Sequence, residues 1–481
     1  MKKMICLLIA LLSLCGCNAV ISDNTAAEET ADAYNLSISE SADDSSYTIN
    51  DSTYISLGSE DVKIKEGGTY ILEGTLSDAS IIVEVSDSED VQLVLNNVTI
   101  ESGDFAGIYI VEGDEITITL ADGSVNTISD SGTYTQIDDN DVDALIYSKA
   151  DLTINGNGTL NLYSSYNHGI VSKDDLIITS GNYKIDVAGQ GLRGKDCLMI
   201  SDGTFDIKAG KDALKSDNDE DEYRGYINIT GGDFVIESSQ DAIYGLNLVN
   251  ISGGSFDIST YSASDSSAKA IKSDVSIEIS GGDFTIDSSD DAIHSDTDIQ
   301  ITGGSFTISS DDDGIHADAK VQIDDGQFDI TAHEGIEATY IVINGGDISI
   351  SATDDAINAS QTVAAYTATI EINGGYITIN MGQGDTDAVD SNGYIYVNGG
   401  TLDITAQSAF DYDKGAEKNG GTIIVNGTQT EQITGQMMGG MGGMGGMGGM
   451  QGPWGNNEQS NEGQDVSEGA SASFGHGHGR H

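Results

Sequence analysis

The chain has 481 residues, of which 79 are Asp or Glu and only 19 are Lys or Arg, giving a formal net charge of −60. Binding to a phosphate backbone needs clustered cations, so this balance excludes nucleic acid as an expected partner. Gly occurs 61 times and Pro once, which suits uninterrupted β-ladders.

Residues 1–17 have the features of a targeting segment. Lys2 and Lys3 precede an apolar run that is too short to serve comfortably as a mature membrane anchor. The run closes on the letters LCGC, which resemble the lipobox of bacterial lipoproteins and imply cleavage before Cys17 and lipidation of its thiol. An ordinary secretory signal with a chance cysteine is the alternative. With lipidation we expect an extracytoplasmic protein anchored in the cell membrane.

Three further segments follow. Residues 18–50 are rich in Ser, Asp, Ala and Glu without periodicity, which predicts a disordered tether. Residues 51–435 carry strand patterns, with Cys197 expected as a buried, inert thiol. Residues 436–481 are a Met/Gly-rich, then His-rich, low-complexity tail. This tail is a spacer or adhesive segment, or else a site for a soft metal such as copper.

A repeat organises residues 51–435. From Ile277 the chain reads IEISGGDFTIDSSDDAIHSD and then, 22 residues later, IQITGGSFTISSDDDGIHAD. Each copy has an I-x-I strand, a Gly-Gly corner, an F-x-I strand and an acidic corner. Short strands at a period near 22 predict an all-β fold, a parallel β-solenoid in which each unit is one coil.

Two positions of the repeat define the interior. The second glycine of each corner is expected to turn the backbone with a positive φ. Two residues later an aromatic or aliphatic side chain recurs, and we expect these side chains to stack inside the solenoid. They are Phe205, Phe234, Phe256, Phe284, Phe306, Phe328, Ile348, Ile377 and Leu402.

The acidic corners align into a ladder with one rung per coil, about 4.8 Å apart. Two unit charges at that distance repel by about 0.9 kcal/mol in water and about 3.5 kcal/mol at an effective dielectric of 20. Raised pKa values relieve part of this repulsion, and bound Ca²⁺ is the better resolution because it accepts six to eight oxygen ligands. Calcium would staple the coils, offer open positions to a ligand, or do both. The predicted metal ligands are Asp212, Asp241, Asp290, Asp291, Asp312, Asp313, Glu334, Asp354, Asp355, Asp387 and Asp390.

Four side chains are candidates for ligand binding. His294 and His316 occupy the same place on adjacent coils, either as polar neighbours of the carboxylates or as part of a zinc site that would need more ligands. Tyr223 and Tyr261 lie in insertions between coils, where loops on a rigid solenoid build binding surfaces. Tyrosine rings beside a calcium-loaded face would suit a sugar polymer.

With its GGxFxI…DDAIHxD coils, its lipobox and its Met-Gly tail, the chain resembles the bacterial secreted carbohydrate-binding β-helix family first described in clostridia. That family is similar to polysaccharide lyases of the right-handed parallel β-helix fold. For roughly Tyr54 to Gly435 the resemblance implies a right-handed parallel β-helix, Ca²⁺ at the acidic corners, and binding of cellulose-like and acidic glycans without established catalysis. The D-D calcium motif of the lyases matches Asp290–Asp291, Asp312–Asp313 and Asp354–Asp355.

Three functions therefore compete. The first is a surface-tethered, calcium-dependent polysaccharide-binding protein without catalysis. The second is a calcium-dependent polyuronate lyase with Lys272 or Lys269 as the base. A base at neutral pH needs a lowered pKa, whereas acidic neighbours raise the pKa of a lysine. The third is a structural or adhesive solenoid without a sugar ligand.

Overall fold

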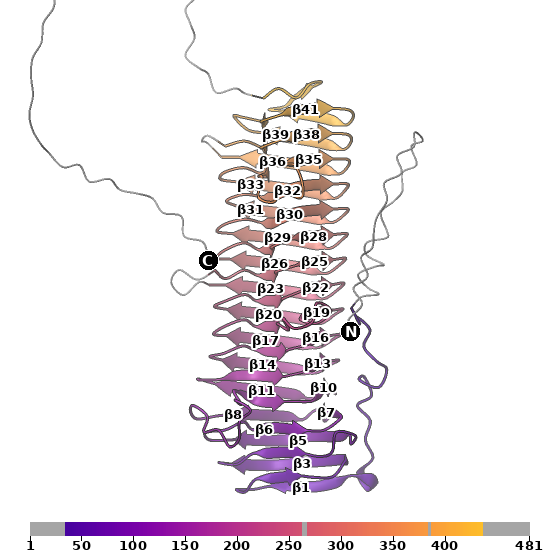
Figure 1. The fold of residues 1–481 in the computed structure, drawn as a ribbon, viewed down its shortest axis with the longest axis vertical. Coiled ribbons are helices and arrows are strands. Elements are labelled where there is room, and N and C mark those ends of the chain that lie inside the picture. The colour runs from indigo at the N-terminus through magenta and orange to yellow at the C-terminus, as the bar shows by residue number, and fades with distance from the viewer. Residues whose placement is uncertain (1–33, 262–266, 383–385, 436–481) are drawn as a thin grey trace, which may run out of the picture. The chain divides into compact units, whose positions relative to one another are not determined.

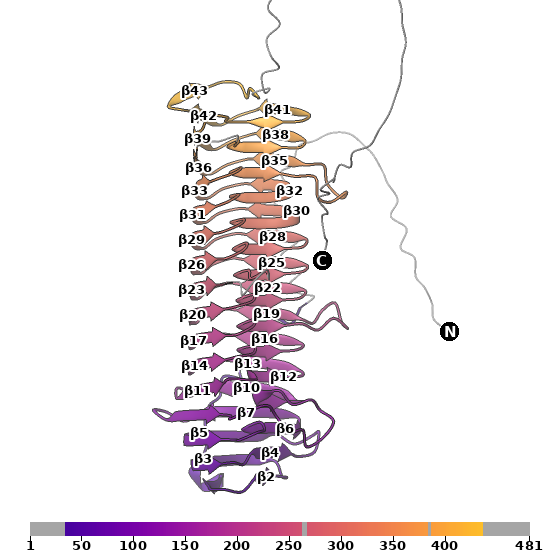
Figure 2. The ribbon, with the colours of Figure 1, turned by 90° about the vertical axis from the view of Figure 1, so that its left-hand side faces the viewer.

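A computed structural model describes residues 34–261, 267–382 and 386–435, and these ranges build one parallel β-solenoid. Its coils stack in chain order from β1 to β41 (Figures 1 and 2). The predicted all-β solenoid is confirmed, since the described residues hold 43 strands and a single 3₁₀ helix, η1 (Ile49–Asp51). The predicted signal segment 1–17 with Cys17, and the tail 436–481, lie outside the described residues.

Each regular coil adds one strand to each of three layers, which we name A, B and C by how the strands pair between coils. Layer A holds the I-x-I strands. Its members are β1 (Thr53–Leu57), β3 (Gly68–Ser77), β5 (Val91–Glu101), β7 (Glu115–Leu120), β10 (Asp151–Asn155), β13 (Asp175–Ile178), β16 (Cys197–Ile200), β19 (Tyr226–Ile229), β22 (Leu248–Ile251), β25 (Ser276–Ile279), β28 (Asp298–Ile301), β30 (Ile315–Ile323), β32 (Ile336–Ile343), β35 (Thr369–Ile372), β38 (Tyr394–Val397) and β41 (Gly415–Lys418).

Layer B holds the F-x-I strands, and the second halves of β3 and β5 also belong to it. The antiparallel strand β43 closes its C-terminal end on β42. Its other members are β8 (Val125–Ser129), β11 (Thr159–Ser164), β14 (Asn182–Val187), β17 (Thr204–Ala209), β20 (Asp233–Ser238), β23 (Ser255–Thr260), β26 (Asp283–Ser288), β29 (Ser305–Ser310), β31 (Gln327–Ala332), β33 (Asp347–Ala352), β36 (Tyr376–Met381), β39 (Thr401–Thr405), β42 (Thr422–Val425) and β43 (Thr428–Thr430).

Layer C holds the short strands that follow the acidic corners, and the first halves of β30 and β32 belong to it. Its other members are β2 (Val62–Ile64), β4 (Ile81–Glu84), β6 (Ile108–Glu112), β9 (Ala144–Ser148), β12 (His168–Ser172), β15 (Leu192–Gly194), β18 (Leu214–Ser216), β21 (Ile243–Gly245), β24 (Ile271–Ser273), β27 (Ile293–Ser295), β34 (Ile357–Ala359), β37 (Val389–Ser391) and β40 (Asp411–Tyr412).

The interior follows the predicted columns. From Tyr183 to Phe328, seven aromatic rings stack with centroids 4.6–4.8 Å apart and interplanar angles of 1–5°. Ile348, Ile377 and Leu402 continue the column, fully buried. The spacing equals the distance between hydrogen-bonded strands, so the backbone ladder itself sets the stacking distance of the rings.

The glycine corners have the predicted backbone. The last glycine of each corner has a positive φ: the ten such glycines from Gly181 to Gly400 have φ between 73° and 132°. The corner is also tight, because a Cβ built on Gly282 would lie 3.0 Å from the Phe284 ring. Glycine is therefore required at this position both for its φ and for the ring beside it.

The predicted disordered tether is wrong for its second half, because residues 34–50 lie along the outer face of layer A. Leu36 and Ile38 pack on a patch formed by Met199, Leu248 and their neighbours. Backbone carbonyls of this segment also accept hydrogen bonds from the Asn155, Tyr226 and Asn228 side chains. The alternating apolar residues of YNLSIS give the segment a face to bury, which its polar composition concealed.

Candidate functional site

The corners that lead from layer B to layer C form the predicted ladder. Backbone amides bond from one coil to the next, for example Ala242 N to Lys269 O at 2.9 Å and Ala292 N to Asp313 O at 2.9 Å. This register places one side chain per coil in line, and we name the set the corner ladder. Its rungs are Asp212, Asp241, Lys269, Asp291, Asp313, Glu334, Asp355 and Asp387.

A second line runs beside the corner ladder on layer C. Strand pairing aligns one outward residue of each coil, and we name this set the strand column. It consists of Lys215, Tyr244, Lys272, His294, His316, Glu337, Asn358 and Asp390, followed by Asp411. Cationic and aromatic groups therefore stand on the earlier coils and carboxylates on the later ones.

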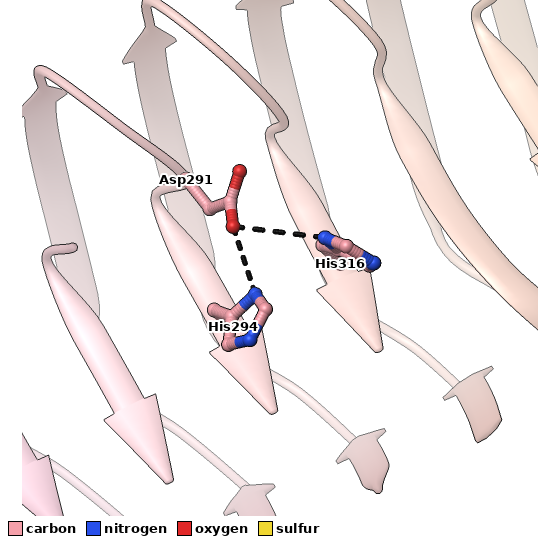
Figure 3. A group of neighbouring side chains, drawn as sticks. All are labelled: Asp291, His294 and His316. Atoms are coloured by element: carbon pink, nitrogen blue, oxygen red, sulfur yellow. Dashed lines mark hydrogen bonds and ion pairs between the residues drawn. The ribbon is translucent and has the colours of Figure 1, made fainter. Parts of the chain in front are cut away.

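Three side chains converge on Asp291: Lys269 from the preceding coil, His294 from the same coil and His316 from the next, and Figure 3 shows the two histidines. Asp291 Oδ2 lies 2.8 Å from His294 Nδ1, 3.6 Å from His316 Nδ1 and 2.9 Å from Lys269 Nζ. Burial alone would raise the pKa of Asp291, but these partners hold it well below its usual range. At this rung side chains of the protein supply positive charge beside the carboxylate.

His294 lies between two carboxylates. Its Nε2 lies 3.0 Å from Asp296 Oδ1, so both ring nitrogens face carboxylates. Burial would lower the pKa of His294, but the hydrogen bonds to Asp291 and Asp296 outweigh it and raise that pKa. Ionised carboxylates only accept hydrogen bonds, so the two contacts favour the protonated ring.

The surroundings of the candidate lyase base Lys269 favour its protonated form, which cannot abstract a proton. Its Nζ also lies 3.0 Å from Asp290 Oδ1. Burial would lower its pKa, but the ion pairs with Asp291 and Asp290 win and raise it. Lys272 lies with its Nζ 3.6 Å from Asp274 Oδ1 and 5.3 Å from the centroid of the Tyr244 ring.

Beyond Asp291 the ladder is acidic, and its rung Asp313 has one imidazole partner, His316, whose Nδ1 lies 3.3 Å from Asp313 Oδ2. Burial, followed by the neighbouring carboxylates, raises the pKa of Asp313 to about 9 and that of Glu334 to about 7. The same causes raise the pKa of Asp355 to about 6 and that of Asp390 to about 7. Burial and repulsion between rungs therefore both favour the neutral carboxyl on this part of the edge.

Several groups on this edge bring three ligand atoms within 4.8 Å of one another. The groups that contain Asp313 and Glu334 also contain imidazoles. Mixed nitrogen and oxygen donors suit zinc better than calcium. The sets are Asp291–His294–His316, Asp313–His316–Glu337, Asp312–Asp313–His333 and His333–Glu334–Asp354.

The last coils fit calcium better. There Asp355, Asp387 and Asp390 present carboxylate oxygens, Asp354 adjoins them, and Asp411 stands in register beside Asp390. Sequence reasoning missed Asp411 and His333. His333 stands at an acidic corner and Asp411 on the strand column, where alignment of AHEGI and AFDYD with the repeat carries the signal.

The two earliest predicted ligands stand apart from the acidic run. Asp212 Oδ2 accepts hydrogen bonds from Lys215 Nζ at 2.8 Å and from Gln190 Nε2 at 3.2 Å. Asp241 Oδ1 accepts one from the Lys269 backbone N–H at 2.9 Å. These carboxylates already have donors and face the cationic half of the strand column.

A sequence profile of the family described as carbohydrate-binding domain-containing proteins matches residues 58–314 and 298–388. These matches span most of the solenoid. The chain belongs to this family.

The chain is similar to two further proteins. A carbohydrate-binding domain-containing protein of Acetivibrio thermocellus is 38% identical over 133 residues, which are 27% of this chain and 46% of the relative. The chain thus spans about half the length of that relative. A solved structure described as a polysaccharide lyase-like protein from C. thermocellum, a gadolinium derivative, is 33% identical, with a TM-score of 0.45. The match covers 47% of this chain and 96% of the chain in that structure.

In this carbohydrate-binding domain the four predicted ligand-binding residues do not form one site. His294 and His316 lie on the strand column. Tyr261 follows β23 at the B-to-C corner and is 44% exposed. Tyr223 lies in the insertion between β18 and β19, with its ring centroid 6.2 Å from that of Tyr34. No helix among the described residues is long and apolar enough to cross a membrane.

Proposed function

We propose that the chain is a cell-surface-tethered, calcium-dependent polysaccharide-binding protein that takes cellulose-like and acidic glycans without cleaving them. One observation carries the proposal: in a carbohydrate-binding family, one edge of the solenoid gathers carboxylates whose pKa values are raised by burial and then by their mutual repulsion. A divalent cation would relieve that repulsion. We also propose that the coils turn in the right-handed sense, as nearly all parallel crossovers do.

Asp354, Asp355, Asp387 and Asp390 are the residues that would hold calcium. Bound there, the ion would supply positive charge to uronate carboxylates and hydroxyls at an otherwise repulsive edge. The chain's own residues keep the donors aligned, because the coil of Asp354 and Asp355 and the coil of Asp387 and Asp390 are held in register by backbone hydrogen bonds. Rigid spacing of this kind favours a repeating polymer over a single small molecule.

The test compares retention on immobilised polygalacturonate with calcium and with a chelator. The double variant Asp355→Asn/Asp390→Asn should lose retention. Its matched control, Asp257→Asn/Asp329→Asn, changes two exposed carboxylates of layer B and should keep it. Calcium at 100 times its Kd should also stabilise the wild type by about 2.7 kcal/mol. Equal retention of the wild type with calcium and with chelator would contradict the calcium dependence.

A polyuronate lyase is the second candidate, and the raised pKa of Lys269 weighs against it. Ultraviolet absorbance of the unsaturated product, measured with Lys269→Ala and Lys272→Ala as controls, decides between binding and cleavage. Product formed by the wild type and lost in either variant would establish the lyase. If the wild type neither binds nor cleaves any glycan, the structural or adhesive solenoid is left.

The surface tether rests on Cys17 and its lipobox-like neighbours. A lipidated chain should partition with the cell membrane, and Cys17→Ser should release it to the medium. Equal membrane association of both proteins would argue against lipidation.

A further inference from the structure

A groove runs along the outer face of layer B, away from the carboxylates assigned to calcium. Its first part is a cavity of about 380 Å³ whose lining includes Tyr163, Asp186, Lys208 and Tyr261. A second cavity of about 380 Å³ shares Ser129 and Asp130 with the first and continues past Glu101 to Asp78. The two cavities adjoin at these shared residues, and we name them together the groove; its lining runs from Ser77 of β3 to Tyr261, which follows β23.

The two tyrosines stand at separate points of the first cavity. Strand pairing carries the column of Tyr163 through Asp186, Lys208 and Glu237 to Ser259, four coils on. Tyr261 follows Ser259 by two residues on the same side of its strand, so the two backbones lie roughly 19 Å apart along the solenoid axis. Their side chains are 38% and 44% exposed.

Aromatic rings at this spacing suit an extended sugar chain. A tyrosine offers an apolar face to the C–H face of a sugar ring and a hydroxyl for hydrogen bonding. The aromatic stack inside the solenoid holds the fold together without either ring. Both are large side chains left exposed inside a cavity, where a ligand would bury them.

The charge of the groove selects the kind of sugar. Asp78, Glu101, Asp130 and Asp186 line it, against Lys208 alone, whose Nζ lies 3.3 Å from Glu237 Oε2. Carboxylates accept hydrogen bonds from sugar hydroxyls but repel uronates. The groove therefore favours a neutral chain over an acidic one.

We propose that this groove binds a neutral, hydroxyl-rich polysaccharide and does so without calcium, leaving the calcium-dependent edge to acidic polymers. The inference rests on the proposed function and divides it between two surfaces. Neutral and acidic glycans then bind together rather than in competition, because the groove and the last coils of the corner ladder use different residues.

The experiment measures binding of cellohexaose and of hexagalacturonate to the full chain by calorimetry, each with calcium and with a chelator. Tyr163→Ala and Tyr261→Ala are tested singly. Tyr376→Ala is the matched control, since Tyr376 is 49% exposed and lines neither cavity. Each groove variant should weaken cellohexaose binding about tenfold or more, with hexagalacturonate binding unchanged. The chelator should abolish only hexagalacturonate binding.

Three results would overturn the inference, and they separate it from the broader proposal. If the groove variants bind cellohexaose like Tyr376→Ala, the groove is not the site, and polysaccharide binding stands. If the chelator abolishes cellohexaose binding, the division by calcium is wrong. If the wild type binds hexagalacturonate alone, no site for a neutral sugar exists. If it binds neither sugar, the proposed polysaccharide-binding function itself is wrong. Equal melting temperatures of the variants check that all are folded.

Discussion

At the scale of single residues, the corner ladder resolves its charge in two different ways. On the rung of Asp291, Lys269 of the preceding coil, His294 of the same coil and His316 of the next coil supply positive charge. On the rung of Asp313, His316 lies 3.3 Å away, but burial and then the surrounding carboxylates raise the pKa of the group and favour its neutral form. Whether a rung carries a charge thus depends on which side chains the adjacent coils present.

Replacing Lys269 tests the first kind of rung. Lys269→Met should destabilise the protein by about 3 to 5 kcal/mol, because it leaves two carboxylates with less compensation in a buried setting. Urea unfolding measures the loss, and adding Asp291→Asn should restore part of it. Lys184→Met, which breaks an exposed pair with Asp206, should cost less than about 1 kcal/mol. Equal losses in the two lysine variants would contradict the assignment.

Asp313 tests the second kind of rung through pH. Its folded pKa of about 9 lies above the value of an unfolded aspartate, so the folded state binds the extra proton. The stability linked to this group is therefore present at low pH and is lost as pH rises from about 4 to about 9. Asp313→Asn should flatten that fall and gain roughly 1 to 3.5 kcal/mol at pH 9 in chelator. Urea unfolding at pH 5 and pH 9 measures both effects, and a slope unchanged by the variant would refute the shift.

At the scale of elements, layer B is joined to the interior by its aromatic stack. Each Phe ring lies on the ring of the next coil at the strand spacing, so the stack and the hydrogen-bond ladder reinforce the same register. A slip of one residue would turn every ring outward, because side chains alternate along a strand. The stack is therefore a register device as well as a source of buried apolar area.

Truncation of a ring in the middle of the stack should strongly lower the free energy of unfolding. Phe256→Ala removes a fully buried ring between Phe234 and Phe284 and should cost about 3 to 5 kcal/mol in urea unfolding. Phe256→Leu keeps apolar volume and should cost less. The neighbouring outward Asp257→Ala is the control and should stay within about 0.5 kcal/mol of wild type. A loss below about 1 kcal/mol for Phe256→Ala would show that the stack can collapse around the gap.

At the scale of the whole solenoid, residues 34–46 act as a strap across several coils. Asn155 Nδ2 donates to Ala42 O at 3.0 Å, and Tyr226 OH donates to Asn35 O at 2.9 Å. These bonds link positions more than 100 residues apart in the chain. In a solenoid each coil otherwise contacts only its neighbours, so the strap adds cooperativity between distant coils.

Charging the apolar face of the strap should release it. Leu36→Asp/Ile38→Asp should speed hydrogen exchange in residues 34–46 and in the covered strands β16 and β19. The expected loss of stability is about 1 to 2 kcal/mol, because both side chains are only partly buried. The exposed Ser37→Asp is the control and should leave exchange unchanged. Exchange that is already fast in the wild type would show that the strap does not hold.

The sequence by itself determined the solenoid, its inward columns and the alignment of the corner ladder. A period of 22 residues and alternation along each strand decide which residues are axial neighbours, because strands one coil apart must pair at a fixed spacing. Asp291 and Asp313 could be placed one above the other on that ground alone, as could Phe256 and Phe284.

The tertiary structure alone decided what those neighbours do. Lys269 and His316 reach Asp291 from the adjacent coils, and His294 reaches it within its own coil. These contacts depend on side-chain rotamers, which the alignment of the repeats does not specify. The path of residues 34–50 and the groove between Tyr163 and Tyr261 arise where chain outside the repeat meets its surface. Period and alternation govern the repeated backbone only, so contacts made by other parts of the chain depend on the folded surface.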